Sequence, residues 1–133
     1  MKFVDTNIFI RYLTDDIPEQ ADACDKIFRN AIENKDPLFT TELVITEIIW
    51  VLESYYALTK EEVQDKVEKI LNTPNLICPN KDLILSALSL YSEKNIDYID
   101  AYNALIVRAQ GIDEVYSYDK HYDRIDWITR IEP

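Results

Sequence analysis

Apolar and polar positions along the chain follow a pattern that predicts short strands separated by longer helices. The apolar run at residues 2–4 predicts a short buried strand, and the run at residues 37–40 predicts a second one. Residues 76–78, 115–118 and 128–131 predict three further strands. In the segments between them, apolar positions recur every three or four residues, which is the spacing of an amphipathic helix.

The second predicted helix starts near Pro18 and carries one continuous apolar stripe. Its apolar residues are three or four positions apart, so they lie along one side of the helix. We expect that side to face a sheet. The members of the stripe are Ala21, Cys24, Ile27, Phe28 and Ile32.

Polar residues and the single glycine mark the ends of other helices. Thr41 is a suitable N-cap for a strongly apolar helix. Thr59 and Glu62 have the spacing of a capping box at the start of the next helix. Gly111 is predicted to close a helix over residues 98–110, because glycine readily adopts the left-handed conformation found there.

Strands that alternate with helices require crossover connections, which place the strands parallel to one another. We therefore predict an α/β fold with a mainly parallel central sheet and helices on both faces. The length of 133 residues and a hydrophobic content of 47% fit one domain, spanning residues 1–133. Ligands of such folds bind beyond the carboxyl ends of the strands. Asp5 and Asp119 each follow a predicted strand and are expected at that position.

The strongly acidic composition narrows the range of functions. A net charge of -11, from 14 basic and 25 acidic residues, argues against a protein that coats nucleic acid with a broad positive surface. A strongly negative net charge remains compatible with carboxylates that are grouped around a cation. Cys24 and Cys78 are far apart, and no secretion signal precedes Lys2, so we expect a reduced, cytoplasmic protein. No run approaches the roughly 18 apolar residues of a membrane span.

Glu47 is the most informative acid. A buried carboxylate without a partner costs several kcal/mol, on the order of the penalties for unpaired buried charges. We therefore expect Glu47 to be paired, with a basic side chain or with a cation, unless it snorkels to water. The residues three and four positions away from it are all apolar: Leu43, Val44, Trp50 and Val51.

Asp97 and Asp100 lie three residues apart at the start of a predicted helix. One aspartate at such a position caps the helix, and a second is favoured by the positive end of the helix dipole. We assign the cap to Asp97 and the functional role to Asp100. The small side chains of Ala101 and Ala104 are expected to leave space beside Asp100.

Asp119 is a functional candidate that can also serve as an ordinary turn residue. Asp123, four residues later, either shares its face or is solvated. Near the N-terminus, Thr6 and Asn7 are predicted helix caps, and either side chain can also orient water or a carboxylate near Asp5.

Four of these carboxylates lie at strand ends or on helix faces that can converge at one edge of a sheet. Clustered carboxylates repel one another unless a cation neutralises them, and hard oxygen ligands suit Mg²⁺ or Mn²⁺. Metal-assisted phosphoryl chemistry is the predicted activity. The single histidine, His121, is expected at the surface beside the site, and the sequence contains no glycine-rich phosphate loop or nucleophile elbow. The four acids are Asp5, Glu47, Asp100 and Asp119.

Four segments give the chain a resemblance to the PIN-domain family, especially to small ribonuclease toxins of the VapC type. Their order and spacing cover nearly the whole chain. One departure from the family pattern is Tyr118, where phenylalanine often precedes the last acid. The segments are FVDTN (3–7), TEIIWVL (46–52), DYIDAYNALIVRAQG (97–111) and VYSYDKHYDRI (115–125).

The resemblance implies an α/β/α sandwich that cleaves RNA as a metal-dependent endoribonuclease. It implies that Asp5, Glu47, Asp100 and Asp119 hold one or two Mg²⁺ or Mn²⁺ ions. The polar residue that follows the first acid in the family corresponds to Thr6 or Asn7, and Asp123 is an auxiliary candidate for the last carboxylate position. Candidate contacts to the RNA backbone are Arg11, Arg108, Lys120 and Arg124.

The family also implies two protein partners, a second copy in a homodimer and a cognate antitoxin that covers the active groove. Tyr55, Tyr56 and the helix over residues 59–71 are candidates for either interface, because aromatic residues are enriched in interface cores.

Two other functions also fit parts of the pattern. A doubly wound phosphatase would use Asp5 as a nucleophile, but that class has a second aspartate two residues later, where this chain has Asn7. A non-enzymatic receiver or assembly domain would bind Mg²⁺ for switching, and Lys120 fits its conserved lysine only loosely.

Overall fold

The computed structural model describes residues 1–33 and 35–133. The chain forms two compact units, Met1–Lys81 and Asp82–Pro133. Each unit is described by itself below. The single domain expected over residues 1–133 concerns the two units together and stays a prediction.

The first unit contains a sheet of three short parallel strands, β1 (Lys2–Phe3), β2 (Leu38–Phe39) and β3 (Leu76–Ile77), in the order β1-β2-β3. Leu38 in the central strand is buried, as expected for a residue paired on both sides. Lys2 and Phe3 are exposed, so the expectation that residues 2–4 form a buried strand is wrong for them. The physical reason is that β1 is an edge strand of this sheet, and only Val4, just after it, is buried.

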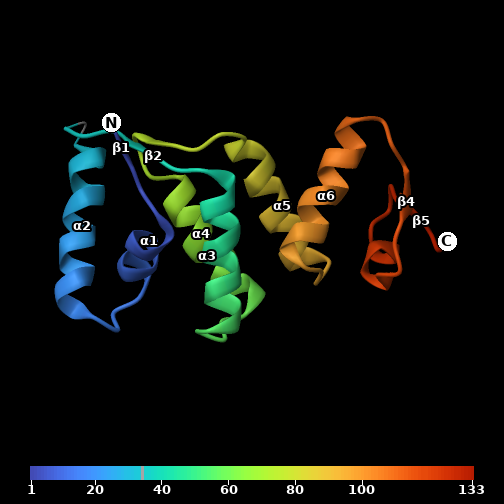
Figure 1. Ribbon diagram of the computed structural model, residues 1–133, viewed down its shortest axis with the longest axis horizontal. Coiled ribbons are helices and arrows are strands. Elements are labelled where there is room, and N and C mark those ends of the chain that lie inside the picture. Colours follow the sequence, from blue (N-terminus) through green and yellow to red (C-terminus); the bar gives the residue numbers. More distant parts are fainter. Residues whose placement is uncertain (34) are drawn as a thin grey trace. The chain divides into compact units, whose positions relative to one another are not determined.

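Four helices accompany this sheet: α1 (Thr6–Leu13), α2 (Pro18–Ile32), α3 (Glu42–Ser54) and α4 (Lys60–Leu71). Helix α1 lies between α2 and α3 (Figure 1) and packs against both. Helix α2 starts at Pro18, as the sequence predicts, because proline is well tolerated in the first turn.

The apolar side of α2 packs against α1, which corrects the expectation that it faces a sheet. The ring of Phe28 lies 5.4 Å from that of Phe9 and 4.3 Å from that of Tyr12. The predicted stripe is also too wide, since Ile27 and Ile32 are 37% and 51% exposed. A neighbouring helix covers a narrower band of the surface of α2 than a sheet would. Ile27 and Ile32, at the edges of the stripe, therefore remain in contact with solvent.

The predicted N-caps of α3 and α4 are confirmed. The hydroxyl of Thr41 accepts a hydrogen bond from the backbone N–H of Val44 at 3.3 Å. Thr59 and Glu62 form the reciprocal capping box, with both side chain to backbone distances at 3.2 Å. These contacts satisfy N–H groups that have no partner inside the helix.

Thr59→Ala is expected to lower the free energy of unfolding by about 1 kcal/mol, because it removes the oxygen that caps α4. Chemical denaturation followed by circular dichroism measures this change. Thr59→Ser keeps the oxygen and should retain most of the stability. Equal stability of the alanine and wild-type proteins would show that the capping box is energetically unimportant.

The second unit contains α5 (Lys81–Glu93), α6 (Tyr98–Ala109), β4 (Glu114–Tyr116), the short 3₁₀ helix η1 (Lys120–Arg124) and β5 (Thr129–Ile131). Helix α5 begins with the last residue of the first unit. Strands β4 and β5 are parallel. Gly111 has φ = 72°, which confirms the predicted left-handed residue after α6.

Every strand pairing among the described residues is parallel, as the alternation of strands and helices predicts. The strands are only two or three residues long, so helices provide most of the core. In the part of the chain that the structure describes, none of the helices is both long and apolar enough to cross a membrane.

Candidate active site

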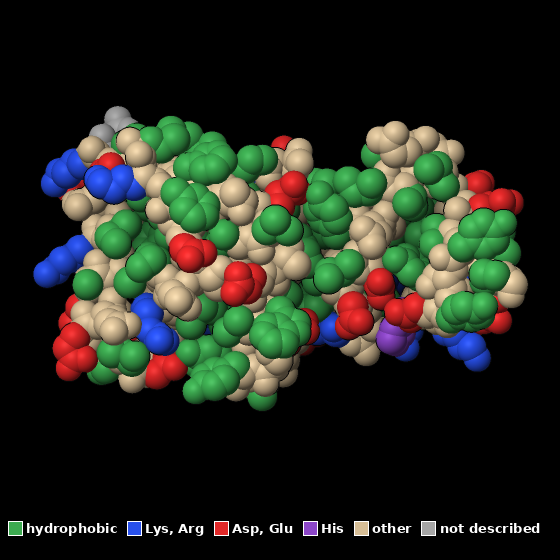
Figure 2. All heavy atoms as spheres, in the orientation of Figure 1, with side chains coloured by type: hydrophobic (Ala, Val, Ile, Leu, Met, Phe, Trp, Pro, Cys, Tyr) green, Lys and Arg blue, Asp and Glu red, His purple; other side chains and the backbone are tan. Residues whose placement is uncertain are grey.

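Asp100, Asp119 and His121 form a cluster in the second unit. Asp100 lies in the first turn of α6, and Asp119 is the residue immediately before η1. Each of the three residues offers one ligand atom, and these atoms all lie within 4.8 Å of one another. Figure 2 shows the histidine side chain (purple) beside acidic side chains (red). The predicted proximity of Asp100 and Asp119 within this unit is therefore present.

The local backbone fixes the position of Asp119. Its Oδ1 atom accepts a hydrogen bond from the backbone N–H of His121 at 2.9 Å, which caps η1. Its own backbone N–H donates to the hydroxyl of Ser117 at 3.0 Å. The bond from the His121 backbone lowers the pKa of Asp119 below its ordinary value. Asp119 is thus both the turn residue and the functional candidate that the sequence offered as alternatives.

Asp100 has the opposite electrostatic situation. Burial raises the pKa of Asp100 above its ordinary value, and the hydrogen-bonded carboxylate of Asp119 raises it further. The phenol of Tyr122 opposes this shift by hydrogen bonding to Asp100. The two carboxyl groups therefore differ, and Asp100 takes up a proton at a higher pH than Asp119 does. A bound cation would compete with that proton.

The imidazole of His121 completes the cluster. Its Nδ1 atom lies 3.0 Å from Oδ1 of Asp119. The two groups are not oriented for a hydrogen bond, and Nδ1 is a buried atom without a hydrogen-bond partner among the described residues. A nitrogen atom within reach of two carboxyl groups is a donor set that fits a divalent metal ion.

The first unit holds a second candidate group, in which Thr6 meets Glu47. The hydroxyl of Thr6 donates a hydrogen bond to Oε2 of Glu47 at 3.0 Å. Thr6 is only 5% exposed, so its hydroxyl is held in place by the surrounding side chains. The sequence left two roles open for Thr6, that of a helix cap and that of a group that orients water or a carboxylate. The contact with Glu47 corresponds to the second role.

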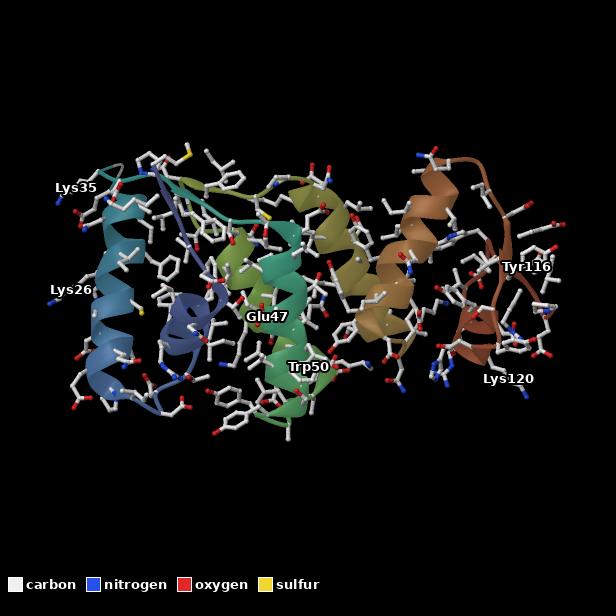
Figure 3. The ribbon with its side chains drawn as sticks, in the orientation of Figure 1. Lys26, Lys35, Glu47, Trp50, Tyr116 and Lys120 are labelled. Carbon is white, nitrogen blue, oxygen red and sulfur yellow. The ribbon has the colours of Figure 1, made fainter. Side chains whose placement is uncertain are left out.

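The basis for selecting Glu47 from the sequence is wrong, because Glu47 lies on the exposed side of α3 (Figure 3). Its apolar neighbours Leu43 and Trp50 are themselves 81% and 66% exposed. The helix buries the side that carries Ile45, Ile48 and other apolar residues instead. No buried charge therefore requires compensation at Glu47.

Asp5 is the N-cap of α1, which corrects the assignment of that role to Thr6 or Asn7. Its Oδ1 atom accepts a hydrogen bond from the backbone N–H of Thr6 at 2.8 Å. Thr6 is already the first residue of the helix, and Asn7 is the second. The helix begins one residue earlier than expected, since aspartate is as good a cap as threonine or asparagine.

Asp123 is engaged by an arginine. Arg130 of β5 donates from Nε to Oδ1 of Asp123 at 3.0 Å and from Nη2 to Oδ2 at 3.2 Å. Such a two-point contact occupies both oxygens of the carboxylate. It also raises the pKa of Arg130. The contact supports a structural role for Asp123 in place of the auxiliary role expected from the sequence.

Asp97 is the N-cap residue of α6, as the sequence predicts, but its side chain makes no capping hydrogen bond. Ala101 and Ala104 are fully buried and pack in the core of the unit. Their small size serves close packing of α6.

The basic residues that are candidates for RNA contact differ in the contacts that they make within the protein. Arg124 donates to the backbone oxygens of Lys94 and Asn95, and Arg108 stacks on the ring of Trp127 at 4.4 Å. Arg11 donates from Nε to Gln20 at 2.9 Å. Lys120 is exposed at the start of η1 (Figure 3).

Sequence reasoning missed the contributions of His121 and Tyr122. A histidine two residues after an aspartate that caps a short helix was a usable signal, because the capping bond brings the two side chains to the same side of the turn. Tyr122 had no such signal, since its contact with Asp100 joins residues far apart in the sequence.

A family model described as "PIN domain" matches residues 2–128. The chain belongs to the PIN-domain family. This assignment confirms the family resemblance and, together with the parallel strand pairing, the predicted α/β fold class.

Two named proteins are similar to this PIN-domain chain. A VapC ribonuclease of Aquifex aeolicus (strain VF5) is 27% identical over 129 residues, which are 97% of this chain and 95% of the relative. The crystal structure of Mycobacterium tuberculosis VapC20, a sarcin-ricin loop cleaving toxin, matches with a TM-score of 0.42 and 17% identity, covering 100% of both chains.

Proposed function

We propose that this PIN-domain chain is a metal-dependent endoribonuclease and the toxin of a type II toxin-antitoxin pair. The observation that carries the proposal is the cluster of Asp100, Asp119 and His121, whose ligand atoms lie within 4.8 Å of one another. The family membership and the ribonuclease name of the Aquifex relative support the same reaction.

The donor set suits Mg²⁺ or Mn²⁺, which we propose as the cofactor. Carboxylate oxygens are the preferred ligands of both ions, and the imidazole nitrogen of His121 is an acceptable additional ligand for Mn²⁺. Such an ion supplies positive charge that polarises the scissile phosphodiester and lowers the pKa of an attacking water.

We propose Asp5 and Glu47 of the first unit and Asp100 and Asp119 of the second as the acids of the reaction. Asp119 is ionised and fixed by the His121 backbone, so it serves as a permanent ligand. The pKa of Asp100 is raised, so protons compete with the ion at this ligand as the pH falls. Thr6 holds one oxygen of Glu47 by its hydrogen bond and thereby limits the rotation of that carboxylate.

RNA is the proposed substrate, and a cognate antitoxin protein and a second copy of the chain are the proposed partners. The free thiols of Cys24 and Cys78 fit action in the reducing cytoplasm. The expected interface on α4 is not supported, because Val63, Val67, Ile70 and Leu71 are fully buried within the first unit. Exposed apolar side chains lie on α3 instead, at Leu43 and Trp50.

Thr6→Val is expected to lower the rate of RNA cleavage by roughly 10- to 100-fold, the usual effect of losing a group that orients a metal ligand. Valine has a similar shape but cannot donate a hydrogen bond to Glu47. Thr6→Ser restores the donor and should recover most of the rate. Single-turnover kinetics with a labelled RNA measures the effect, and an unchanged rate for Thr6→Val would remove Thr6 from the reaction.

The proposed function is tested by incubating the purified protein with a structured RNA in Mn²⁺, in Mg²⁺ and in EDTA. Cleavage is expected with either metal and not in EDTA, and Asp5→Asn and Glu47→Gln should abolish it. Water as the nucleophile leaves no 2′,3′-cyclic phosphate, so mass spectrometry should find only linear ends. Intact RNA under all conditions, or equal cleavage in EDTA, would refute the proposal.

A further inference from the structure

A pocket of about 400 Å³ opens beside Glu47 within the first unit. Its walls come from α1, the segment that joins α1 to α2, and the second half of α3 with the residues that follow it. Thr6 and Glu47, the pair joined by a hydrogen bond, form one wall of this pocket. Whatever occupies the pocket therefore lies next to a proposed catalytic carboxylate.

Two tyrosines that contact each other also line the pocket. The hydroxyl of Tyr56 donates a hydrogen bond to Oδ2 of Asp16 at 2.6 Å. The rings of Tyr55 and Tyr56 meet edge to face, with centroids 4.9 Å apart and planes at 74°. Asp16 thus anchors Tyr56, and Tyr56 in turn supports the ring of Tyr55.

Tyr55 is 76% exposed, so most of its ring has no contact with the protein. A flat aromatic surface that is supported at its edge and otherwise exposed is suited to stacking on another planar group. Nucleobases are such groups, and their stacking on tyrosine is a common mode of binding single-stranded RNA.

Arg11 supplies a positive group in the same pocket. Its hydrogen bond to Gln20 uses Nε, so the bond orients the guanidinium while Nη1 and Nη2 remain as donors on its outer edge. Guanidinium groups bind phosphate oxygens through two parallel hydrogen bonds. Asp16 accepts its hydrogen bond from Tyr56, and its pKa is lowered by side-chain hydrogen bonds and, to a smaller extent, by the positive charge of Arg11. Nη1 and Nη2 of Arg11 are the donors proposed to contact a phosphate.

We propose that this pocket is a subsite for one nucleotide of single-stranded RNA, with the base stacked on Tyr55 and a phosphate held by Arg11. The inference rests on the proposed ribonuclease function, since it places that nucleotide beside the phosphodiester to be cut. A mixed lining of an aromatic ring, a guanidinium and hydrogen-bonding side chains fits a nucleotide better than an apolar helix of a protein partner.

The test measures RNA binding in EDTA, where no cleavage occurs. A short single-stranded RNA with 2-aminopurine at one position is titrated with the protein, because stacking of this base quenches its fluorescence. Tyr55→Ala is expected to bind on the order of 10-fold more weakly and to lose quenching. Tyr55→Phe keeps the ring and should behave as the wild type.

Trp50→Ala is the matched control, because Trp50 is an exposed aromatic residue of α3 (Figure 3) and is not part of the pocket lining. It should leave binding and quenching unchanged. Arg11→Gln should weaken binding and reduce its dependence on salt, while quenching at saturation is retained. This second variant keeps the test valid should Tyr55→Ala fold poorly.

Unchanged affinity and quenching in both Tyr55→Ala and Arg11→Gln would overturn the subsite and leave the pocket for a protein partner. An equal loss in Trp50→Ala would also overturn it, because the stacking would then not belong to this pocket. Failure of the ribonuclease proposal has a different signature, in which the wild type binds and quenches the RNA but does not cut it in Mn²⁺.

Discussion

Asp100→Asn is expected to reduce RNA cleavage on the order of 10²- to 10³-fold, the effect of removing one preorganised electrostatic group from a reaction centre. Asparagine keeps the size of the side chain but has no negative charge with which to hold a cation. Single-turnover cleavage at saturating Mn²⁺ measures the loss. The same substitution should leave the metal-free protein folded, because burial and Asp119 already raise the pKa of Asp100 and disfavour its charged form.

Asp123→Asn is the matched control for this substitution. Asp123 lies close to Asp119 in the sequence, but its oxygens are held by Arg130 at 3.0 and 3.2 Å. Its cleavage rate should therefore stay within a few fold of the wild-type rate, provided that the melting temperature is retained. A loss in Asp123→Asn as large as that in Asp100→Asn would contradict the assignment of roles to the two acids.

Mn²⁺ is expected to raise the melting temperature substantially. An ion that binds only the folded protein stabilises it by about 2.7 kcal/mol at a concentration of 100 times its Kd. For a chain of this length the corresponding shift is on the order of 10 °C. Differential scanning calorimetry in Mn²⁺ and in EDTA measures the shift, which Asp100→Asn should largely remove. The same melting curve in both solutions would contradict a metal site in this cluster.

The stabilisation by Mn²⁺ should become smaller as the pH is lowered. The metal binds the ionised carboxylates, and the pKa of Asp100 is raised, so a proton begins to compete at a higher pH than for an ordinary aspartate. Asp119 has a lowered pKa and stays ionised further into the acidic range. Of the two carboxylates, Asp100 is therefore the one at which protons compete with the metal at the higher pH.

The ends of several helices could be predicted because caps are local chemistry. Thr41, Thr59 and Gly111 lie within a few residues of the groups they satisfy, and their roles follow from the sequence alone. The same locality left one ambiguity at the N-terminus, where Asp5, Thr6 and Asn7 are all good caps. Their roles are separated by the hydrogen bond that Asp5 accepts from the Thr6 N–H and by the contact of Thr6 with Glu47, 41 residues away.

The side of a helix that faces solvent could not be predicted from spacing alone. Leu43, Glu47 and Trp50 lie on one face of α3, and their mostly apolar character made that face look buried. Helix α3 is apolar on nearly every side, so its neighbours in space decide which side is covered. The fork between Arg130 and Asp123 was hidden for a similar reason, because it depends on where β5 pairs.

The central claim is that Asp100 and Asp119 hold the divalent ion on which RNA cleavage depends. Isothermal titration of Mn²⁺ into the wild type, Asp100→Asn and Asp123→Asn at neutral pH tests this claim most directly. The account predicts saturable binding by the wild type and by Asp123→Asn, and at least about 10-fold weaker binding by Asp100→Asn. Equal Mn²⁺ affinity in all three proteins, or no binding by the folded wild type, would contradict it.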